Sequence, residues 1–253
     1  MPITATDIVA YAALNKPIDD TSTNGGGVDL DERVVFTDLA VNDSVEVLSS
    51  SAADTTQQVT VTARLASGAT VAQTVTLTGV TPVVLSTMGV VQRIQRGLLN
   101  ADAAGIVTVR RAGAAGDIAA IPIGERGFRR MFINAFSIAA SPKVYFEKLF
   151  IRNNHATLAL LTAVIKQNAD PTALVTFLLA AAKNDSATSA NRLTPPAVGD
   201  TLDPDTFADT DQSVPGTDLG PGEGIGCWLA LSLAAANSPI DSTFTIQADG
   251  STT

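Results

Sequence analysis

The sequence predicts an all-β protein with two β-sandwich domains and an extended N-terminal arm. The length of 253 residues suits two domains of about 100–130 residues, each large enough to bury a core. From residue 33 onward, Val and Thr alternate with polar or small residues, and this period of two indicates half-buried strands. The alternating runs are short and separated by turn residues, as is typical of antiparallel sandwiches.

Residues 1–30 are expected to form the arm and its hinge. Residues 3–14 have a weak apolar pattern, and Gly25, Gly26 and Gly27 follow without side chains that could pack. Consecutive glycines have large conformational freedom, so the sequence predicts a flexible hinge. The arm either locks onto a neighbouring subunit or is disordered, and the sequence leaves both alternatives open.

The first domain is expected over residues 31–124. The alternation predicts strands at residues 44–48, 59–65, 71–77, 90–98, 106–110 and 118–123. The link Ala66-Ser67-Gly68-Ala69 favours a hairpin between two of them. A helical interpretation is disfavoured because Thr and Val are poor helix formers and no 3.6-residue period is sustained.

The second domain is expected over residues 125–253. Its predicted strands cover residues 128–138, 144–151, 158–167, 174–181, 225–233 and 244–248. Residues 158–182 could instead hold a helix, but Asp170-Pro171 would split it, so two strands and a turn are favoured. A loop over residues 184–224 is too long for a plain connection in a compact domain, which suggests a functional role.

The composition excludes several functional classes. The chain is 45% hydrophobic and 16% charged, which is too apolar for a disordered protein. A single Cys and a single His exclude a disulfide framework, a multi-cysteine zinc site and a histidine-rich metal centre. The net charge of −9 argues against direct nucleic-acid binding, and no apolar segment reaches the roughly 20 residues that span a bilayer. We therefore expect no cofactor, no metal and no membrane contact.

No catalytic residue is predicted. His155 lacks a recognisable nucleophile or orienting acid, so we interpret it as a turn histidine that bonds local backbone. Between residues 200 and 224 the long loop contains seven acids and no Lys or Arg: Asp200, Asp203, Asp205, Asp209, Asp211, Asp218 and Glu223. A bound Ca²⁺ is one alternative, although the helix–loop–helix calcium pattern is absent. A solvated loop, or one that faces a basic neighbour, is favoured.

Basic residues gather in the middle of the chain. Seven arginines face three acids between residues 88 and 130: Arg93, Arg96, Arg110, Arg111, Arg126, Arg129 and Arg130. This asymmetry is compatible with self-assembly, in which the acidic loop of one copy meets the basic face of another. The favoured alternative is that the arginines solvate outward faces of strands. Nucleic-acid contact is disfavoured because no aromatic residues interleave with them.

Four short segments carry motifs shared by a group of proteins. They are MPITATDI at residues 1–8, KLFIRNNHAT at 148–157, LGPGEGIGCW at 219–228 and DSTFTIQADG at 241–250. In these segments the chain resembles tailed-bacteriophage virion structural proteins. The resemblance covers the arm and the second domain. The first domain resembles an additional immunoglobulin-like module, most clearly in GIVTVRR at residues 105–111.

The resemblance implies a non-enzymatic virion protein, assembled in the host cytoplasm, and brings no catalytic residues. We expect a capsid decoration (cement) protein that contacts the major capsid protein or other virion proteins and associates with itself. A tail tube, neck or baseplate component is the alternative within the structural class. A carbohydrate-binding adhesive module is the alternative from another class, disfavoured because the chain has only Trp228, Tyr11 and Tyr145 beside its phenylalanines.

Overall fold

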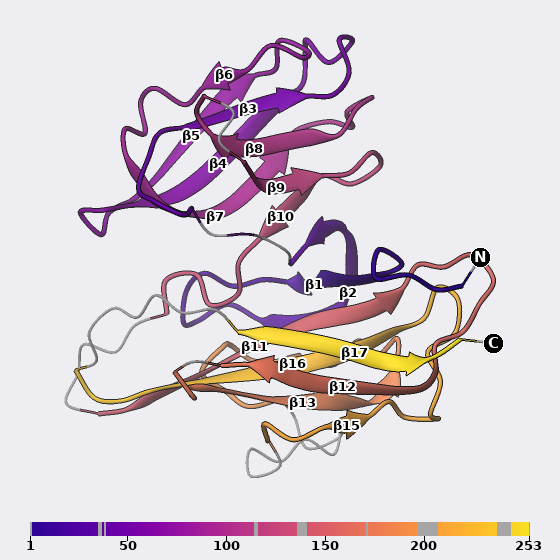
Figure 1. Ribbon diagram of the computed structural model, residues 1–253. Helices are drawn as coiled ribbons and strands as arrows, with labels where there is room; N and C mark the ends of the chain where they lie inside the picture. The colour runs from indigo at the N-terminus through magenta and orange to yellow at the C-terminus, as the bar shows by residue number, and fades with distance from the viewer. Residues whose placement is uncertain are drawn as a thin grey trace. The chain divides into compact units, whose positions relative to one another are not determined.

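The computed structural model is all-β and divides into two compact units (Figure 1). It describes residues 2–34, 37, 39–113, 116–135, 141–170, 172–196, 207–236 and 244–252, and no helix occurs within these ranges. Unit 1 comprises Met1–Asp29 and Phe132–Thr253, and unit 2 comprises Leu30–Met131. Unit 2 is therefore an insertion in the sequence of unit 1. This division replaces the expected boundaries at residues 30 and 124.

Unit 2 contains two sheets that share one core. Its strands are β3 (Val45–Ser49), β4 (Gln58–Leu65), β5 (Thr70–Thr76), β6 (Val83–Val84), β7 (Val91–Leu99), β8 (Val107–Arg111), β9 (Asp117–Ile121) and β10 (Gly127–Arg129). One sheet has the order β10-β7-β4-β5, with the end of β2 (Asn24–Arg33) beside β10, and the other has the order β6-β3-β8-β9. Val59 and Val61 of the first sheet belong to the same buried cluster as Val107 and Val109 of the second. This shared core is consistent with a β-sandwich.

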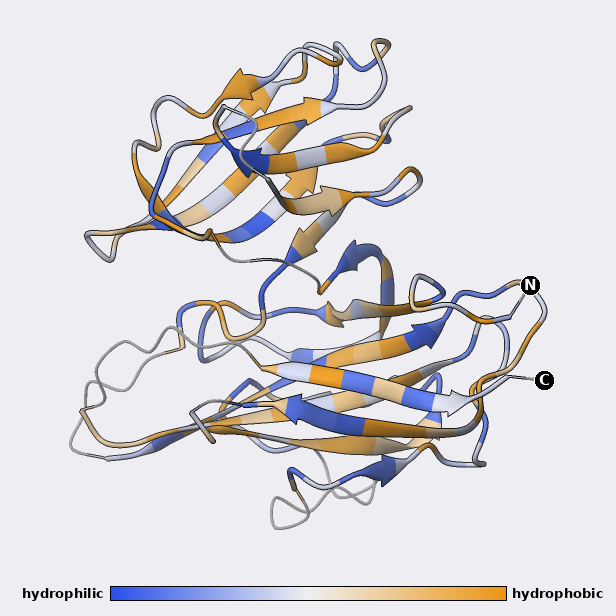
Figure 2. Ribbon diagram, in the orientation of Figure 1, coloured by the Kyte–Doolittle hydropathy of each residue, from blue (hydrophilic) through white to orange (hydrophobic). Residues whose placement is uncertain are grey.

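The period-two pattern in unit 2 has its expected physical origin. Along β4, Val59, Val61 and Ala63 are buried, whereas the residues between them are more exposed. The 66–69 link forms the predicted hairpin, where Leu65 donates its N–H to the Ala69 carbonyl at 2.8 Å. The apolar colouring of Figure 2 runs along the strands of this unit, interrupted by polar positions.

Unit 1 contains a second set of two sheets. Its remaining strands are β1 (Ile8–Asn15), β11 (Lys143–Asn153), β12 (Leu161–Ala169), β13 (Val175–Lys183), β14 (Thr188–Ser189), β15 (Gln212–Ser213), β16 (Gly224–Leu233) and β17 (Thr245–Ser251). The larger sheet has the order β13-β16-β11-β1-β2, with β14 paired to β2, and the smaller has the order β15-β12-β17. Residues 158–182 thus hold two strands rather than a helix. Figure 2 shows the alternation of polar and apolar residues along β17.

The expected N-terminal arm is replaced by two paired strands. β1 pairs antiparallel with β11, from Ile8 opposite Asn153 to Ala12 opposite Leu149. The predicted hinge lies within β2, where Gly25 is buried and has a φ of 88°. A Cβ on Gly25 would lie 2.6 Å from the Trp228 ring, so glycine is required there by packing.

Two further expectations need correction. Within the described part of the predicted strand over residues 128–138, only Phe128 and Arg129 are extended, as part of β10, because Phe132 and Asn134 adopt positive φ values of 56° and 59°. Residues 136–138 lie outside the described residues. The loop expected over residues 184–224 contains the short strands β14 and β15. Residues 197–206 of that loop lie outside the described residues.

Candidate functional site

Two of the sequence motifs meet at one corner of unit 1, where Asn153 ends β11. The buried Asn153 side chain donates hydrogen bonds to the carbonyls of Leu158 (2.8 Å) and Leu219 (2.9 Å) and accepts one from the His155 N–H (2.9 Å). His155 Nδ1 in turn accepts the N–H groups of Thr157 (3.2 Å) and Leu158 (3.0 Å). His155 therefore shapes the turn after β11 through its ring, as the sequence interpretation proposed.

The turn before β16 interlocks with this corner. The Asn153 N–H donates to the Glu223 carbonyl at 2.9 Å, and the Gly222 N–H donates to the Asn153 carbonyl at 2.8 Å. Glu223 Oε2 accepts hydrogen bonds from the Lys183 ammonium at 2.5 Å and from the Gly220 N–H at 2.7 Å. The Lys183 hydrogen bond, supported by that of Gly220, holds the pKa of Glu223 below its usual range against the opposing effect of burial. The glycine-rich turn is thus fixed by its own carboxylate.

Lys148, in the middle of β11, is a fully buried cation. Its ammonium donates to the carbonyls of Gly26 (3.0 Å) and Ala187 (3.3 Å) and forms an ion pair with Asp185. It also lies 4.8 Å from the Phe150 ring centroid and 5.4 Å from that of Trp228. Three acceptors and two aromatic faces compensate the desolvation that burial of this charge requires.

Glycine makes room for this ion pair on the neighbouring strand. A Cβ on Gly226 would overlap Asp185 Oδ2 and would lie 2.7 Å from Lys148 Cε. Both approaches are far closer than van der Waals contact allows. The second glycine of GIGCW is therefore explained by the buried carboxylate beside it rather than by a turn.

Arg192 forms a second buried cationic centre in unit 1. Its guanidinium binds the Asp20 carboxylate (2.9 Å) and the carbonyls of Ile133 (2.6 Å) and Asn134 (3.1 Å). It also lies over the Tyr145 ring, 4.8 Å from the centroid. Burial alone would raise the pKa of Asp20, but its bonds to Lys143 and Arg192 hold that pKa below the usual range. The β1–β2 loop and the 133–134 segment are thereby tied together.

Six of the seven arginines in the cluster form ion pairs or backbone hydrogen bonds within unit 2. Arg96 binds Glu32 through two nitrogen–oxygen contacts of 2.8 and 3.0 Å, and Arg110 binds Glu46 at 2.8 Å. Further pairs or backbone bonds are Arg111–Asp43, Arg126–Asp102, Arg129 to the Arg130 carbonyl, and Arg130 to the Ile94 carbonyl. Most of the acidic partners lie outside residues 88–130. The local excess of arginine along the sequence is therefore not an unpaired basic face.

The net charge is divided unequally between the units. Unit 2 contains nine acidic and nine basic residues, whereas unit 1 contains sixteen acidic and seven basic residues. Within unit 1, Asp211 lies 3.4 Å from Lys166, and Asp218 accepts the Thr162 N–H at 2.9 Å. Asp200, Asp203 and Asp205 lie outside the described residues. Asp211, Asp218 and Glu223 thus meet groups of their own unit.

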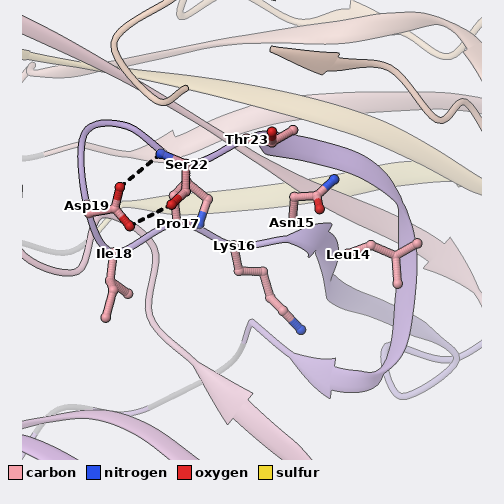
Figure 3. Close-up of a pocket in the computed structure, with 8 residues that line it drawn as sticks. All are labelled: Leu14, Asn15, Lys16, Pro17, Ile18, Asp19, Ser22 and Thr23. Carbon is pink, nitrogen blue, oxygen red and sulfur yellow. Dashed lines mark hydrogen bonds between the residues drawn. The ribbon is translucent and has the colours of Figure 1, made fainter. Parts of the chain in front are cut away.

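A shallow hollow lies on the β1–β2 loop (Figure 3). Its lining comes from one continuous stretch, residues 14–19 together with Ser22 and Thr23. Asp19 fixes the loop by accepting the N–H and hydroxyl groups of Thr21 and Ser22, and these hydrogen bonds hold its pKa well below the usual range. Lys16 forms an ion pair with Asp29. The Ser22 hydroxyl thus meets a carboxylate whose lowered pKa makes it a weak base.

The described residues also bear on the metal site, the thiol and the membrane span that the sequence analysis considered. Within the described ranges, no three His, Cys, Asp or Glu side chains converge as a metal-binding group. Cys227 is fully buried, and burial raises the pKa of its thiol. Among the described residues, no helix has the length and apolar character that a membrane span requires.

Sequence reasoning missed Lys148, Asp185 and Arg192 as buried charges. One signal was present: the adjacent charges Glu147 and Lys148 lie inside the otherwise apolar strand VYFEKLFI. Successive strand residues point to opposite faces of the sheet, so two adjacent charges on a strand that is covered on both faces are both buried. Glu147 and Lys148 are both buried. No comparable signal marks the loop residues that pair with them.

We compared the chain with protein-family models, with curated proteins and with solved structures, and no match was found in any of the three.

Proposed function

We propose that this chain is a non-enzymatic structural protein of a tailed-bacteriophage virion. Within that class we favour a capsid decoration protein that binds the major capsid protein or other virion proteins and also associates with itself. It would be assembled in the host cytoplasm and located in the virion. On the same resemblance, we infer an immunoglobulin-like sandwich for unit 2 and a β-sandwich for unit 1.

The observation that carries the proposal is how the motif residues are used. The segments 148–157 and 219–228 lie side by side through the pairing of β11 with β16. Their distinctive side chains, Lys148, Asn153 and Trp228, are buried and hold strands and turns together. What the chain shares with the virion group is thus a rigid frame, as expected where subunits act through many weak contacts on a particle.

The aromatic residues argue against the carbohydrate-binding alternative. Sugar-binding faces commonly expose Trp and Tyr, but Trp228, Tyr11 and Tyr145 are all buried. A tail tube, neck or baseplate position remains the second candidate, because the resemblance to virion proteins does not distinguish positions on the particle.

Cryo-electron microscopy of purified particles tests the proposal. A decoration protein is expected as repeated density on the icosahedral lattice, into which the all-β units fit. Density confined to the tail or neck would favour the second candidate. Absence of the polypeptide from purified particles, measured by mass spectrometry against a known capsid protein as the control, would overturn the virion assignment.

A further inference from the structure

Strand β5 is an open edge of unit 2. It lies at the end of its sheet and pairs on one side only, with β4. Its seven residues alternate between exposed and half-buried. A strand of this length with one unpaired side presents a row of backbone donors and acceptors to solvent.

The hydrogen-bond register shows which groups face outward. Leu65 donates to Ala69, and the same ladder pairs Ala63 with Val71 and Val61 with Gln73. The N–H and C=O groups of successive residues in an antiparallel strand point to alternate sides, so those of the odd-numbered residues of β5 point toward β4. The N–H and C=O groups of Thr70, Ala72, Thr74 and Thr76 therefore point away, and no hydrogen bond found in the described part of unit 2 uses them.

Strand β17 is also a seven-residue sheet end that pairs on one side only, but it carries the charged Asp249, which is bound by Lys166. The remaining sheet ends of the described structure are covered or very short. On β13, Phe177 exchanges two backbone hydrogen bonds with Ala208, of 2.9 and 3.1 Å. On β9, the Ile118 carbonyl accepts the Thr37 N–H at 2.9 Å. Strands β6 and β15 have two residues each. Strand β5 has none of these protections.

The chain segment that contains β5 lacks the charges that normally prevent edge pairing, although Arg64 of β4 lies opposite Thr70 at one end. No Asp, Glu, Lys, Arg or His occurs from residue 65 to residue 92, in a chain that is 16% charged. The same segment exposes Val80, Val84 and Val90, each by about half of its surface. Natural proteins usually place charged side chains on open edges to block association, so this segment suits association instead.

The sequence of β5 is self-complementary. It is TVAQTVT, centred on Gln73, so that reversal places Val71 opposite Val75 and Thr70 opposite Thr76. In that register Ala72 meets Thr74, and both turn their backbone groups outward. When two copies of β5 pair antiparallel about Gln73, the outward N–H and C=O groups of one copy therefore lie opposite those of the other and can form hydrogen bonds.

We propose that two copies of this chain associate through β5, antiparallel about a two-fold axis at Gln73. The pairing would join the β10-β7-β4-β5 sheets of two unit 2 domains and form about eight backbone hydrogen bonds. A second copy is the occupant because the strand complements itself and unit 2 has balanced charge, so two such units meet without net repulsion. This inference deepens the self-association of the proposed function by naming the strand through which it occurs, and it does not depend on the position of the chain in a virion.

Sedimentation velocity of the intact chain tests the pairing. The wild type is expected to shift from 26.0 kDa to twice that mass as concentration rises. The double substitution Ala72→Lys/Thr74→Lys places a lysine opposite a lysine in the two central pairs of the dimer, where residue 72 of each copy faces residue 74 of the other. This repulsion should weaken the dimer at least about tenfold. Ala66→Lys/Ser67→Lys is the matched control, because it adds the same charge at the exposed hairpin turn outside the paired segment.

A cross-link tests the register independently of the lysine variants. Gln73→Cys should give a disulfide-linked dimer on mild oxidation, because the two residues would face each other with Cα atoms about 4.5 Å apart. Thr74→Cys is the control: each introduced thiol would lie opposite Ala72 of the other copy, two positions from the second thiol and beyond disulfide reach. The native Cys227 is fully buried and does not compete.

Each outcome decides the matter. A concentration-dependent dimer that the edge lysines abolish, together with a cross-link at position 73 alone, supports the pairing. A wild type that stays monomeric, a dimer that tolerates the edge lysines, or equal cross-linking at position 74 overturns it. None of these failures touches the virion assignment, which is tested on the particle itself. Far-UV circular dichroism of every variant, compared with wild type, verifies that each remains folded.

Discussion

Lys148 and Trp228 lie directly opposite each other on β11 and β16, with the ammonium 5.4 Å from the indole centroid. Both side chains are buried, and Asp185 supplies the counter-charge from the segment after β13. A buried charge is strongly destabilising when its partner is removed. This relationship makes unit 1 sensitive to changes that leave its apolar core intact.

Removal of the cation should destabilise unit 1. We expect Lys148→Met to lower the free energy of unfolding by about 3–5 kcal/mol, because it leaves the Asp185 carboxylate buried without its cation. The double variant Lys148→Met/Asp185→Ala should recover part of this loss. Urea unfolding followed by Trp fluorescence measures it, and the single Trp reports on unit 1 alone. Lys166→Met, at a partly exposed pair, is the control and should change stability by less than about 1 kcal/mol.

A methyl group on Gly226 should be poorly tolerated. We expect Gly226→Ala to destabilise unit 1 by roughly 1–3 kcal/mol, because its Cβ would overlap Asp185 and Lys148. Gly224→Ala on the same strand is the matched control, since its nearest atoms would lie 3.6 Å away. Thermal melting of both variants measures the difference. Equal melting temperatures would contradict the packing described around the ion pair.

The stability of the corner around Asn153 should depend more on the Asn153 amide than on the His155 ring. Asn153→Ala removes the amide partner of the Leu158 carbonyl and the His155 N–H and one of the two donors to the Leu219 carbonyl, which should cost about 2–3 kcal/mol. His155→Ala removes an acceptor at a more exposed turn and should cost about 1 kcal/mol. Urea unfolding of the two variants gives the order. A larger effect for His155 would point to a role beyond the turn.

Asp54 should make unit 2 sensitive to acid. Burial alone would raise the pKa of Asp54, but hydrogen bonds from Ser49 Oγ (2.5 Å) and the N–H groups of Ala104 (2.8 Å) and Gly105 (3.0 Å) outweigh it and lower the pKa. A lowered folded-state pKa stabilises the fold above the unfolded value of about 3.9, and this stabilisation is lost as the pH falls through the folded value.

Thermal unfolding between pH 7 and pH 2 measures the Asp54 effect. Asp54→Asn should be less stable than wild type at pH 7 by about 1–3 kcal/mol, and the difference should shrink below pH 4. Asp102→Asn, at an exposed carboxylate, is the control and should follow the wild-type curve. A difference between Asp54→Asn and wild type that is constant with pH would contradict the assignment of this carboxylate.

The sequence predicted those strands whose two faces differ. Val and Thr alternate along β4 and β5, and both strands were located within one residue of their ends. By contrast, β2 reads NGGGVDLDER, and neither glycine nor acidic residues favour strands. Gly25 is required because Trp228 packs against it, a contact between residues about 200 positions apart that no local pattern contains.

The buried charges could be predicted only in part, because their partners are also distant in the sequence. Lys148 could be suspected from its apolar strand, but its acceptors Asp185 and Ala187 come from a loop whose position depends on the whole sheet. The arginines of unit 2 show the same limit. Arg96 and Arg110 appear as local excess charge along the chain, and they are neutralised by Glu32 and Glu46, 64 positions away in each case.

The insertion of unit 2 between β2 and β11 determines the order in which strands find their partners during synthesis. Strand β1 leaves the ribosome early, but β11 begins at Lys143, after all of unit 2 has been made. At about 5–20 residues per second, the nascent β1 waits roughly 6–26 s for its neighbour. Strand β1 can pair with β2 as soon as β2 has been made, whereas its second edge stays open while unit 2 completes its core. One edge of the first strand to be translated is therefore among the last to be paired.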